Sequence, residues 1–321
     1  MTANRTSLVS IFAAFGALAL VALPAKAQTK VTGGVAAYNE ALLPVFAARD
    51  LGYLEKEGVT LDLVDFKGGG PAVQALAGGS IDICFCAADH VIRLRARKQP
   101  AQILIGLDTF HSYVLVAKAD APFKDLAGLK GKRVGITSPG SLTDNTIRFS
   151  MKDLGLNPDR DFEITGAGGG ASMQAAIDSG QVAAGMVILT DMANMFQKQG
   201  AYKIVVDYRQ LPYPSFAALS LESFVKNKPA AAKGFVRAVA KAIDALEKDP
   251  ELAKQQLAKM FPNFTPALVA EVAKSAVERT PKGGMVSAES IDNLNKIVLA
   301  TDDTVKAVTL REAFDASLLK D

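Results

Sequence analysis

Segments with the hydrophobic pattern of β-strands alternate along this chain with segments that have the hydrophobic pattern of helices. Short apolar or alternating runs predict β-strands at 30–35, 59–66 and 81–87. Helical spacing of apolar residues predicts helices between them, the first over 41–51 with Leu42, Leu43, Phe46 and Leu51 on its core face. The second helix follows a glycine triplet and begins with Pro71 in its first turn. The predicted order is therefore strand, helix, strand, glycine triplet, helix, strand.

The same order returns about 100 residues further along. A strand at 133–137 leads through a Ser/Gly loop into a helix, and further strands are predicted at 162–165 and 181–189. Phe46, Asp50, Leu51 and Gly52 recur at an offset of 103 as Phe149, Asp153, Leu154 and Gly155, and the triplet Gly68–Gly70 recurs at an offset of 100. Repeated βαβ units imply parallel strands with right-handed crossovers. We therefore expect an α/β protein with two lobes, each a mainly parallel sheet flanked by helices.

Two chain crossings are expected between the lobes. Apolar runs at 101–107 and 113–119 predict a strand that leaves the first lobe near residue 115, and a run at 216–221 predicts the return. Lobe 1 would then comprise 28–115 and 216–321, lobe 2 would comprise 116–215, and two strand segments would form the hinge. From Lys228 onward the pattern is helical, with a last short helix predicted at 305–319.

The first 27 residues are typical of a secretory signal peptide. Arg5 precedes an apolar run from Leu8 to Leu23, and Ala25-Lys26-Ala27 closes it. The run is shorter than the ~20 residues of a membrane-spanning helix. We therefore expect cleavage after Ala27 and a mature protein in the periplasm. Without the leader the chain keeps 34 basic and 33 acidic residues, a net charge of about +1 that argues against nucleic acid as a partner.

Cys84 and Cys86 are separated by one residue. On a strand they would point to the same face, but a disulfide between them would be strained, so we expect buried free thiols. Two sulfur ligands do not make a zinc site, and no cofactor is expected. With two histidines and neither an HExxH nor a GxSxG motif, the chain offers little for hydrolytic catalysis.

Candidate ligand-binding residues follow the predicted strands, because ligands of open α/β sheets bind at the carboxyl ends of the strands. Helices that open there present N–H groups without intrahelical acceptors. The main candidate is the loop of Ser138, Pro139, Gly140 and Ser141, for which an ordinary helix cap is the alternative. Its counterparts are Ala37, Tyr38, Asn39, Gly69, Gly70, Gly169 and Gly170. The other candidates are Ala88, Asp89, His90, His111, Thr190, Asp191 and Tyr213.

Three stretches give the chain a resemblance to a known family. Pro44–Gly58, Gly79–Ile83 and Leu129–Gly135 resemble bacterial solute-binding proteins of ABC transporters, in the family for nitrate, alkanesulfonates, taurine and thiamine-pyrimidine precursors. The resemblance covers nearly all of the mature chain. It implies a type II periplasmic-binding-protein fold with a closing cleft, a monomer that is not an enzyme, and docking on a membrane permease. It also implies that the ligand meets helix N-termini at Ser138–Thr143 and Gly69–Ala72.

The ligand and one rival function stay open. Sulfonate and taurine binders often surround the anion with tryptophan or arginine, whereas this chain has no Trp and places Asp89, Asp108, His111 and Asp191 in candidate loops. A sulfonate-, nitrate- or taurine-like anion, a thiamine-pyrimidine precursor and an aromatic solute are all compatible with this. A similar enzyme, fungal thiamine-pyrimidine synthase, has a cysteine-rich run that Cys84-Phe85-Cys86 partly matches. A periplasmic sensor domain is the third alternative.

Overall fold

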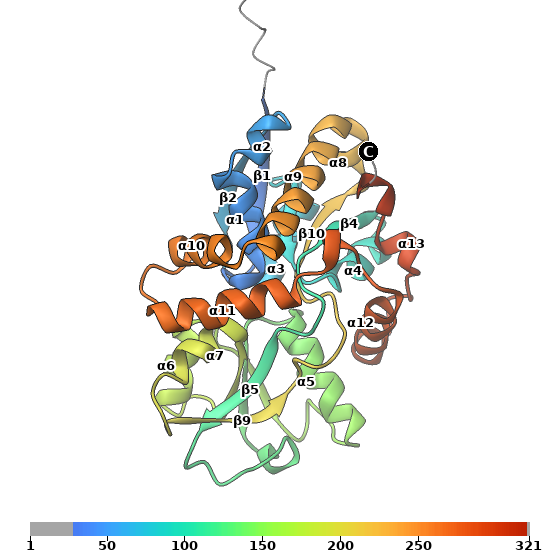
Figure 1. Ribbon diagram of the computed structural model, residues 1–321. Coiled ribbons are helices and arrows are strands. Elements are labelled where there is room, and N and C mark those ends of the chain that lie inside the picture. The colour runs from blue at the N-terminus through green and yellow to red at the C-terminus, as the bar shows by residue number, and fades with distance from the viewer. Residues whose placement is uncertain (1–27, 320–321) are drawn as a thin grey trace, which may run out of the picture.

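The computed structural model describes residues 28–319, so the predicted signal peptide and its cleavage after Ala27 lie outside the described residues. Its strands form two five-stranded sheets (Figure 1), in the orders β2-β1-β3-β10-β4 and β7-β6-β8-β5-β9. The first sheet contains β1 (Thr29–Val35), β2 (Val59–Asp65), β3 (Ile83–Cys86), β4 (Ala101–Gly106) and β10 (Ala217–Leu221). The second contains β5 (Tyr113–Lys118), β6 (Arg133–Ile136), β7 (Glu163–Gly166), β8 (Ala184–Ile188) and β9 (Tyr202–Asp207).

The two sheets have the same topology, as the repeated sequence order predicts. In the first sheet β1 pairs in parallel with β2 and β3, and in the second β6 pairs in parallel with β7 and β8. The antiparallel strand of each sheet is the one that has just crossed from the other half. β10 lies between β3 and β4, and β5 lies between β8 and β9. Residue 115 falls inside β5, and residue 216 directly precedes β10.

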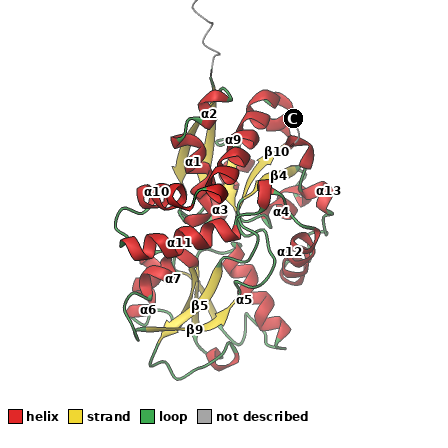
Figure 2. Ribbon diagram, viewed as in Figure 1, coloured by secondary structure: helices red, strands yellow, loops and turns green. Residues whose placement is uncertain are grey.

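Helices flank both sheets (Figure 2). In the first part of the chain these are η1 (Glu40–Leu42), α1 (Leu43–Asp50), α2 (Tyr53–Lys56), α3 (Gly69–Ala77) and α4 (His90–Ala96). The middle part contributes η2 (Ala127–Leu129), α5 (Leu142–Asp153), α6 (Ala171–Asp178) and α7 (Leu189–Met195). The last part contributes α8 (Glu222–Asn227), α9 (Pro229–Lys248), α10 (Pro250–Met260), α11 (Pro266–Arg279), η3 (Lys282–Gly284), α12 (Ala288–Thr301), α13 (Leu310–Ala313) and η4 (Ala316–Leu319).

The long helix α9 shows how the hydrophobic pattern fixes the core of the first half. Phe235, Val239, Ile243 and Leu246 recur at helical spacing, and all four are buried. The Phe235 ring packs 6.0 Å from the ring of Phe85 on β3, so α9 covers a face of the first sheet. Burial of each such side chain stabilises the fold by roughly 1.5–3 kcal/mol.

The predicted helix over 305–319 is wrong. Two short helical turns, α13 and η4, are separated there by Phe314, whose backbone is extended (φ −141°, ψ 121°). Phe314 is buried and forms an isolated bridge with Ile103 of β4. Pairing of this residue with the edge of the first sheet overrides the local helical pattern.

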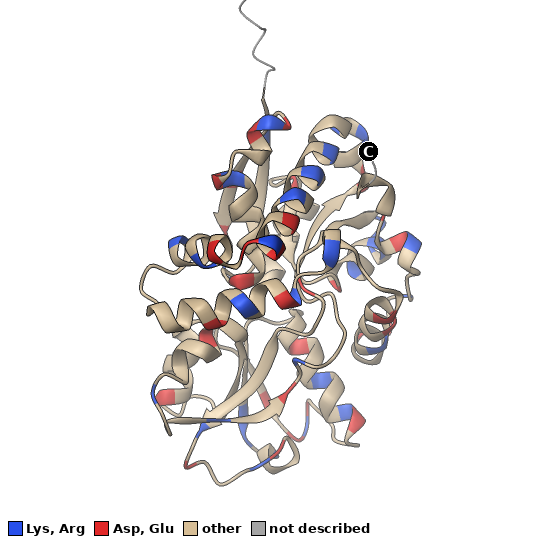
Figure 3. Ribbon diagram, in the orientation of Figure 1, with Lys and Arg blue, Asp and Glu red and all other residues tan. Residues whose placement is uncertain are grey.

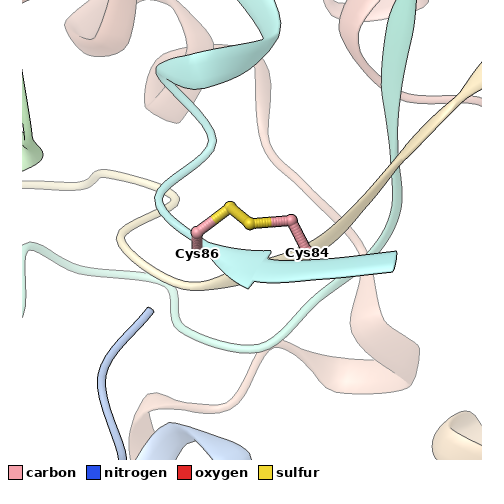
Figure 4. The surroundings of a disulfide bond; sticks show 2 residues. All are labelled: Cys84 and Cys86. Atoms are coloured by element: carbon pink, nitrogen blue, oxygen red, sulfur yellow. A yellow bond between two sulfur atoms is a disulfide. The ribbon is translucent and has the colours of Figure 1, made fainter. Parts of the chain in front are cut away.

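The prediction of free cysteines is also wrong, because Cys84 and Cys86 form a disulfide on β3 (Figure 4). An extended strand places residues i and i+2 on one face. Their Cα atoms lie 5.6 Å apart, which is within the range that a disulfide spans. Both side chains are fully buried, so the bond belongs to the core of the first half.

Two crossing segments, residues 107–112 and 208–216, join the first half (the first sheet and its helices) to the second half. They lie side by side, since His111 N donates to Leu211 O and Tyr213 N donates to Thr109 O, both at 2.9 Å. The helix α11 lies across the junction and contacts η1 of the first half and α7 of the second (Figure 1). The two halves are therefore connected by two adjacent segments of the chain.

Acidic and basic residues are interleaved on the helices of both halves, so neither sign dominates the face shown in Figure 3. Between residues 28 and 319, none of the helices combines the length and the apolar character that a membrane crossing requires.

Candidate functional site

The loops that follow the strands of both sheets meet around a cavity of about 360 Å³. The first half contributes the loops after β1, β2 and β3, and the second half contributes the equivalent loops after β6, β7 and β8. The walls comprise Ala36, Ala37, Tyr38, Asp65, Lys67, Gly68, Gly69, Ala87, His90, Tyr113, Thr137, Ser141, Leu142, Thr143, Gly168, Gly169, Gly170, Ala171, Ser172, Met186, Ile188, Asp191, Ser215 and Phe216. Neither half encloses this space alone.

The glycine turn of the first half touches the Ser/Pro turn of the second at the edge of this cavity. A Cβ atom added to Gly68 would lie 3.4 Å from Ser138 Oγ, and one added to Gly70 would lie 3.6 Å from Pro139 O. The N-termini of α3 and α5 therefore approach each other from opposite halves. The sequence repeat predicts that these turns face a common gap, and the structure brings them together.

The N-terminus of α5 is built by a compact network of hydroxyl groups. Ser141 has an extended backbone and caps the helix, with its Oγ accepting from Asp144 N at 3.4 Å and lying 2.8 Å from Thr143 Oγ1. Asp144 in turn accepts from Gly140 N at 2.8 Å. The N–H groups of Leu142 and Thr143, in the first turn, have no intrahelical acceptor. Because both residues line the cavity, this end of α5 favours a polar or anionic group there.

Asp191 brings a carboxyl group to the same cavity from the first turn of α7. Its Oδ2 accepts from the N–H of Gly170, the N-cap residue of α6, at 3.0 Å. Burial raises the pKa of Asp191 to about 6, although the Gly170 N–H favours the charged form. The second half thus presents a helix N-terminus and an acidic group next to each other.

His90 faces the cavity from the first half and packs against Gly69. A Cβ atom at position 69 would lie 2.8 Å from His90 Nε2, so glycine is required here for the imidazole to keep its place. Burial lowers the pKa of His90, and the nearby Asp89 opposes this. His90 is therefore a neutral group that offers one donor and one acceptor.

Two tyrosines give the cavity aromatic surface. Tyr38 is 41% exposed, and its ring is supported by those of Phe46 and Phe261 at 5.3 and 5.5 Å. Tyr113 is buried at the start of β5, and burial together with Asp191 and Glu40 raises the pKa of its phenol. Tyr113 therefore stays protonated, while Tyr38 offers a ring face for stacking.

Eight of the eighteen sequence-predicted site residues line the cavity, namely Ala37, Tyr38, Gly69, His90, Ser141, Gly169, Gly170 and Asp191. The other ten lie outside its walls: Asn39, Gly70, Ala88, Asp89, His111, Ser138, Pro139, Gly140, Thr190 and Tyr213. Asn39, for example, caps η1, with its Oδ1 accepting from Ala41 N at 2.8 Å. Sequence reasoning missed Lys67, Tyr113, Thr137, Met186 and Phe216. Thr137 had the clearest local signal, since it ends a predicted strand that leads into the Ser/Gly loop.

His111 lies in the first crossing segment, outside the cavity. Its Nδ1 accepts from Tyr113 N at 3.2 Å, so its Nε2 carries the proton and donates to Thr146 Oγ1 at 2.8 Å. Burial lowers the pKa of His111 to about 3. The rings of Tyr208 and Tyr213 pack around it at 5.3 and 5.5 Å. A neutral histidine thus links the first crossing segment to α5.

A buried carboxyl group joins the two halves beside the cavity. Thr190 Oγ1 donates to Glu40 Oε2, and Glu40 N donates to Thr190 Oγ1 at 3.3 Å. The other carboxyl oxygen of Glu40 is buried without a hydrogen-bond partner among the residues that the structure describes. Burial raises the pKa of Glu40 to about 7, and the nearby Asp108 and Asp191 act in the same direction. Glu40 therefore holds a proton in this arrangement over most of the acidic range.

A second hollow of about 530 Å³ lies beside the crossing segments. It is bordered by α1, α9, α11, η3 and α12, and by residues 108–109 and 214. None of its walls comes from the loops of the second sheet, so movement of the two halves would not close it around a solute. Within residues 28–319, no group of three or more His, Cys, Asp or Glu side chains is placed to hold a metal ion.

The family model described as "NMT1/THI5 like" matches residues 39–253 of this chain. Among curated proteins, 4-amino-5-hydroxymethyl-2-methylpyrimidine phosphate synthase of Saccharomyces cerevisiae is 23% identical over 253 residues, which cover 74% of this chain and 71% of the relative. The putative binding protein YtlA of Bacillus subtilis is 25% identical over 220 residues, which cover 67% of this chain and 65% of YtlA.

Solved structures share the architecture at low sequence identity. A protein from Bordetella bronchiseptica RB50 superposes with a TM-score of 0.80 at 24% identity, covering 91% of this chain and 96% of its own. The periplasmic aliphatic sulphonate binding protein SsuA from Escherichia coli gives 0.67 at 20%, covering 91% and 99%. The periplasmic nitrate-binding protein NrtA from Synechocystis PCC 6803 gives 0.70 at 19%, covering 91% and 87%. These likenesses confirm the predicted periplasmic-binding-protein fold.

Proposed function

The chain belongs to the NMT1/THI5-like family, and from this premise we propose that it is the solute-binding component of an ABC importer. It captures a small organic solute in the cavity between its two halves. The observation that carries this proposal is the cavity of about 360 Å³, whose walls are equivalent loops from both sheets. A solute held there contacts both halves at once, which is how a two-lobed binding protein couples capture to closure.

Closure follows from these contacts as a shift between two populations. With lobe 1 at 28–115 and 216–321 and lobe 2 at 116–215, the open form exposes each set of loops separately. A solute stabilises the closed form by the contacts that it makes only when both lobes reach it. The crossing segments absorb the rotation, since they are the two places where the chain passes between the sheets.

The chemistry of the cavity supports a sulfonate-, nitrate- or taurine-like solute. The N-termini of α3, α5 and α6 all contribute residues to the walls, and each favours an anionic group. Lys67 adds a positive side chain. Asp191 disfavours a plain anion next to it, so a zwitterion such as taurine, with its ammonium group at Asp191, fits both features.

A thiamine-pyrimidine precursor or an aromatic solute is the second candidate. The observations that favour it are the exposed ring of Tyr38 and the carboxyl group of Asp191, which would accept from a ring amino group. Curated relatives are named as synthases of an aminopyrimidine phosphate, which is a compound of the same class as this second candidate.

We propose that the protein is not an enzyme, although curated relatives are named as synthases. Neither Cys84 nor Cys86 lines the cavity, and the two are joined in a buried disulfide. The double variant Cys84→Ser/Cys86→Ser tests this point. Solute binding should survive the substitution, whereas turnover that disappears with the two sulfurs would support a synthase.

A periplasmic location, after removal of residues 1–27, and docking of the monomer on membrane permease subunits complete the proposal. A sensor domain that delivers its bound form to a receptor is the remaining alternative. Neighbouring permease and ATPase genes would favour transport, and a neighbouring histidine kinase gene would favour sensing.

Thermal unfolding of the protein from residue 28 onward tests the function directly. Taurine, methanesulfonate, nitrate, aminopyrimidines and benzoate are each added in large excess, and calorimetry follows any solute that raises the melting temperature. A specific solute at about 1,000 times its Kd adds about 4 kcal/mol of stability. Binding with 1:1 stoichiometry that Asp191→Asn alters, by weakening an amine-bearing solute or strengthening a plain anion, supports the cavity as the site. A solute that binds both this variant and Gly69→Ala with the same affinity as the wild-type protein would contradict the proposed site.

A further inference from the structure

A buried polar bridge joins the two halves outside the cavity. Asp89 precedes α4 in the first half, Arg93 lies one turn further along α4, and Asn145 lies on α5 of the second half. Arg93 Nη1 donates to Asp89 Oδ2 at 3.0 Å, and Arg93 Nη2 donates to Asn145 Oδ1 at 2.9 Å. Asn145 Nδ2 donates to Asp89 Oδ2 at 2.7 Å. The amide of Asn145 therefore bonds both members of an ion pair that belongs to the other half.

We propose that Asn145 is a positioning residue that holds the halves together and so sets solute affinity without touching the solute. This inference rests on the proposed function, in which the closed form is the one that captures the solute. None of Asp89, Arg93 and Asn145 lines the cavity. Their effect must therefore pass through the equilibrium between open and closed forms.

The chemistry of the bridge is specific to an amide. The carbonyl oxygen of Asn145 accepts from the guanidinium, and its NH₂ group donates to the carboxylate, so each end meets the charge that it suits. A carboxylate at position 145 would lie beside Asp89 and repel it. An alanine would leave both charged groups without their partner from the second half.

Burial makes this bridge matter more than a surface contact. The Asp89 side chain is fully buried, Asn145 is 3% exposed and the Arg93 side chain is 15% exposed. Asp89 Oδ2 accepts both hydrogen bonds, and Asp89 Oδ1 has no hydrogen-bond partner among residues 28–319. Hydrogen bonds from a neutral group to buried charges are stronger than neutral pairs in water.

The bridge divides when the halves separate. Asp89 is the N-cap residue of α4, and Arg93 lies four residues further along the same helix. Oδ2 of Asp302 lies 3.5 Å from Arg93 Nε, so the ion pair stays within the first half. Asn145 leaves with α5. Opening therefore costs the two hydrogen bonds of Asn145 and nothing else in this cluster.

The test compares Asn145→Ala and Asn145→Asp with Asn157→Ala as the matched control. Asn157 lies in the second half and accepts from Asp159 N and Arg160 N within its own loop, so its loss weakens a local turn and no contact between the halves. Alanine is the best helix former, so α5 should persist in Asn145→Ala. Far-ultraviolet circular dichroism spectra of the ligand-free variants that match the wild type verify this.

The primary readout needs no solute. Spin labels at Lys124→Cys and Asn227→Cys, which are exposed positions in different halves, report the distance between the halves in the ligand-free protein. We expect the longer-distance population to grow in Asn145→Ala and to grow further in Asn145→Asp, because of repulsion from Asp89. The control should match the wild type. An unchanged distribution in both Asn145 variants, or an equal change in the control, would overturn the proposal.

Binding supplies the second readout, with taurine and methanesulfonate as probes. If closure is the affected step, Asn145→Ala should weaken every probe that binds by the same factor, about 10-fold. Different factors for different probes would show direct contact and overturn the proposal. If neither probe binds the wild type, the solute proposal fails for this chemistry, while the distance measurement still decides the role of Asn145.

Discussion

Arg279, the last residue of α11, places its Nη2 atom 2.9 Å from Oδ2 of Asp108 in the first crossing segment. The same nitrogen donates to the carbonyl oxygens of Phe110 and His111 at 3.0 and 3.2 Å. Its Nη1 reaches Arg209 O in the second crossing segment at 3.5 Å. One guanidinium from the C-terminal helices thus contacts both of the crossing segments that join the two halves.

Removal of this guanidinium should destabilise the protein. In Arg279→Met the buried carboxyl of Asp108 loses its cation, and breaking a buried ion pair from one side costs about 3–5 kcal/mol. Asp108→Asn should cost less, since it leaves no buried anion. Urea unfolding of both single variants and the double variant gives the coupling energy. Additive losses, with no coupling, would show that the pair does not act as a unit.

Stability should depend on pH through Glu40. Its pKa in the folded protein is about 7, above the ordinary value of 4.5, so folding favours the protonated form. The stabilisation is complete below about pH 4.5 and is lost as the pH rises through about 7. The melting temperature should therefore fall between pH 5 and pH 8, and Glu40→Gln should flatten this profile. The exposed carboxylate variant Glu289→Gln is the control, and an equally steep profile in Glu40→Gln would exclude this group as the origin.

The two glycines at the start of α3 should respond differently to alanine. Gly69→Ala places a methyl group 2.8 Å from His90 Nε2 and forces the imidazole away, whereas Gly70→Ala meets its neighbours at 3.6 Å or more. Titration calorimetry should show weaker solute binding in Gly69→Ala and little change in Gly70→Ala. Adding His90→Ala to Gly69→Ala removes the imidazole that the new methyl group meets, and should restore the stability that the single variant Gly69→Ala loses. If Gly69→Ala and Gly70→Ala bind the solute equally well, the residues around His90 must shift to accommodate the added methyl group.

Asp191→Asn discriminates between the ligand classes. Loss of the carboxyl charge should weaken an amine-bearing or zwitterionic solute by about 10-fold or more and should strengthen a plain anion. Because the pKa of Asp191 is about 6, the affinity of the wild type for a cationic nitrogen should rise as the pH increases through that value. An affinity that is independent of pH between 5 and 7 would place the charged nitrogen elsewhere.

The parallel βαβ units of both halves were predictable because local sequence signals encode them twice. The triplets Gly68–Gly70 and Gly168–Gly170 end equivalent strands in both halves, and β1 and β6 hold equivalent places in their sheets. The helical spacing of Phe235, Val239 and Ile243 likewise fixes the buried face of α9.

The parts that sequence reasoning missed depend on contacts between distant segments. Phe314 is extended because it pairs with Ile103, and Tyr113 lines the cavity because β5 enters the second sheet beside β8. His111 stays outside the cavity because its ring bonds to Thr146, 35 residues away. Cys84 and Cys86 face the same way as residues i and i+2 of a strand, and their Cα separation of 5.6 Å allows the disulfide that strain was expected to prevent.

Small-angle X-ray scattering of the protein with and without its tightest solute tests the central claim most directly. If loops from both halves enclose the solute, the radius of gyration should decrease on saturation, and the decrease should follow the occupancy measured by calorimetry. A solute that saturates the cavity while the scattering curve stays unchanged would contradict capture by closure of the two halves.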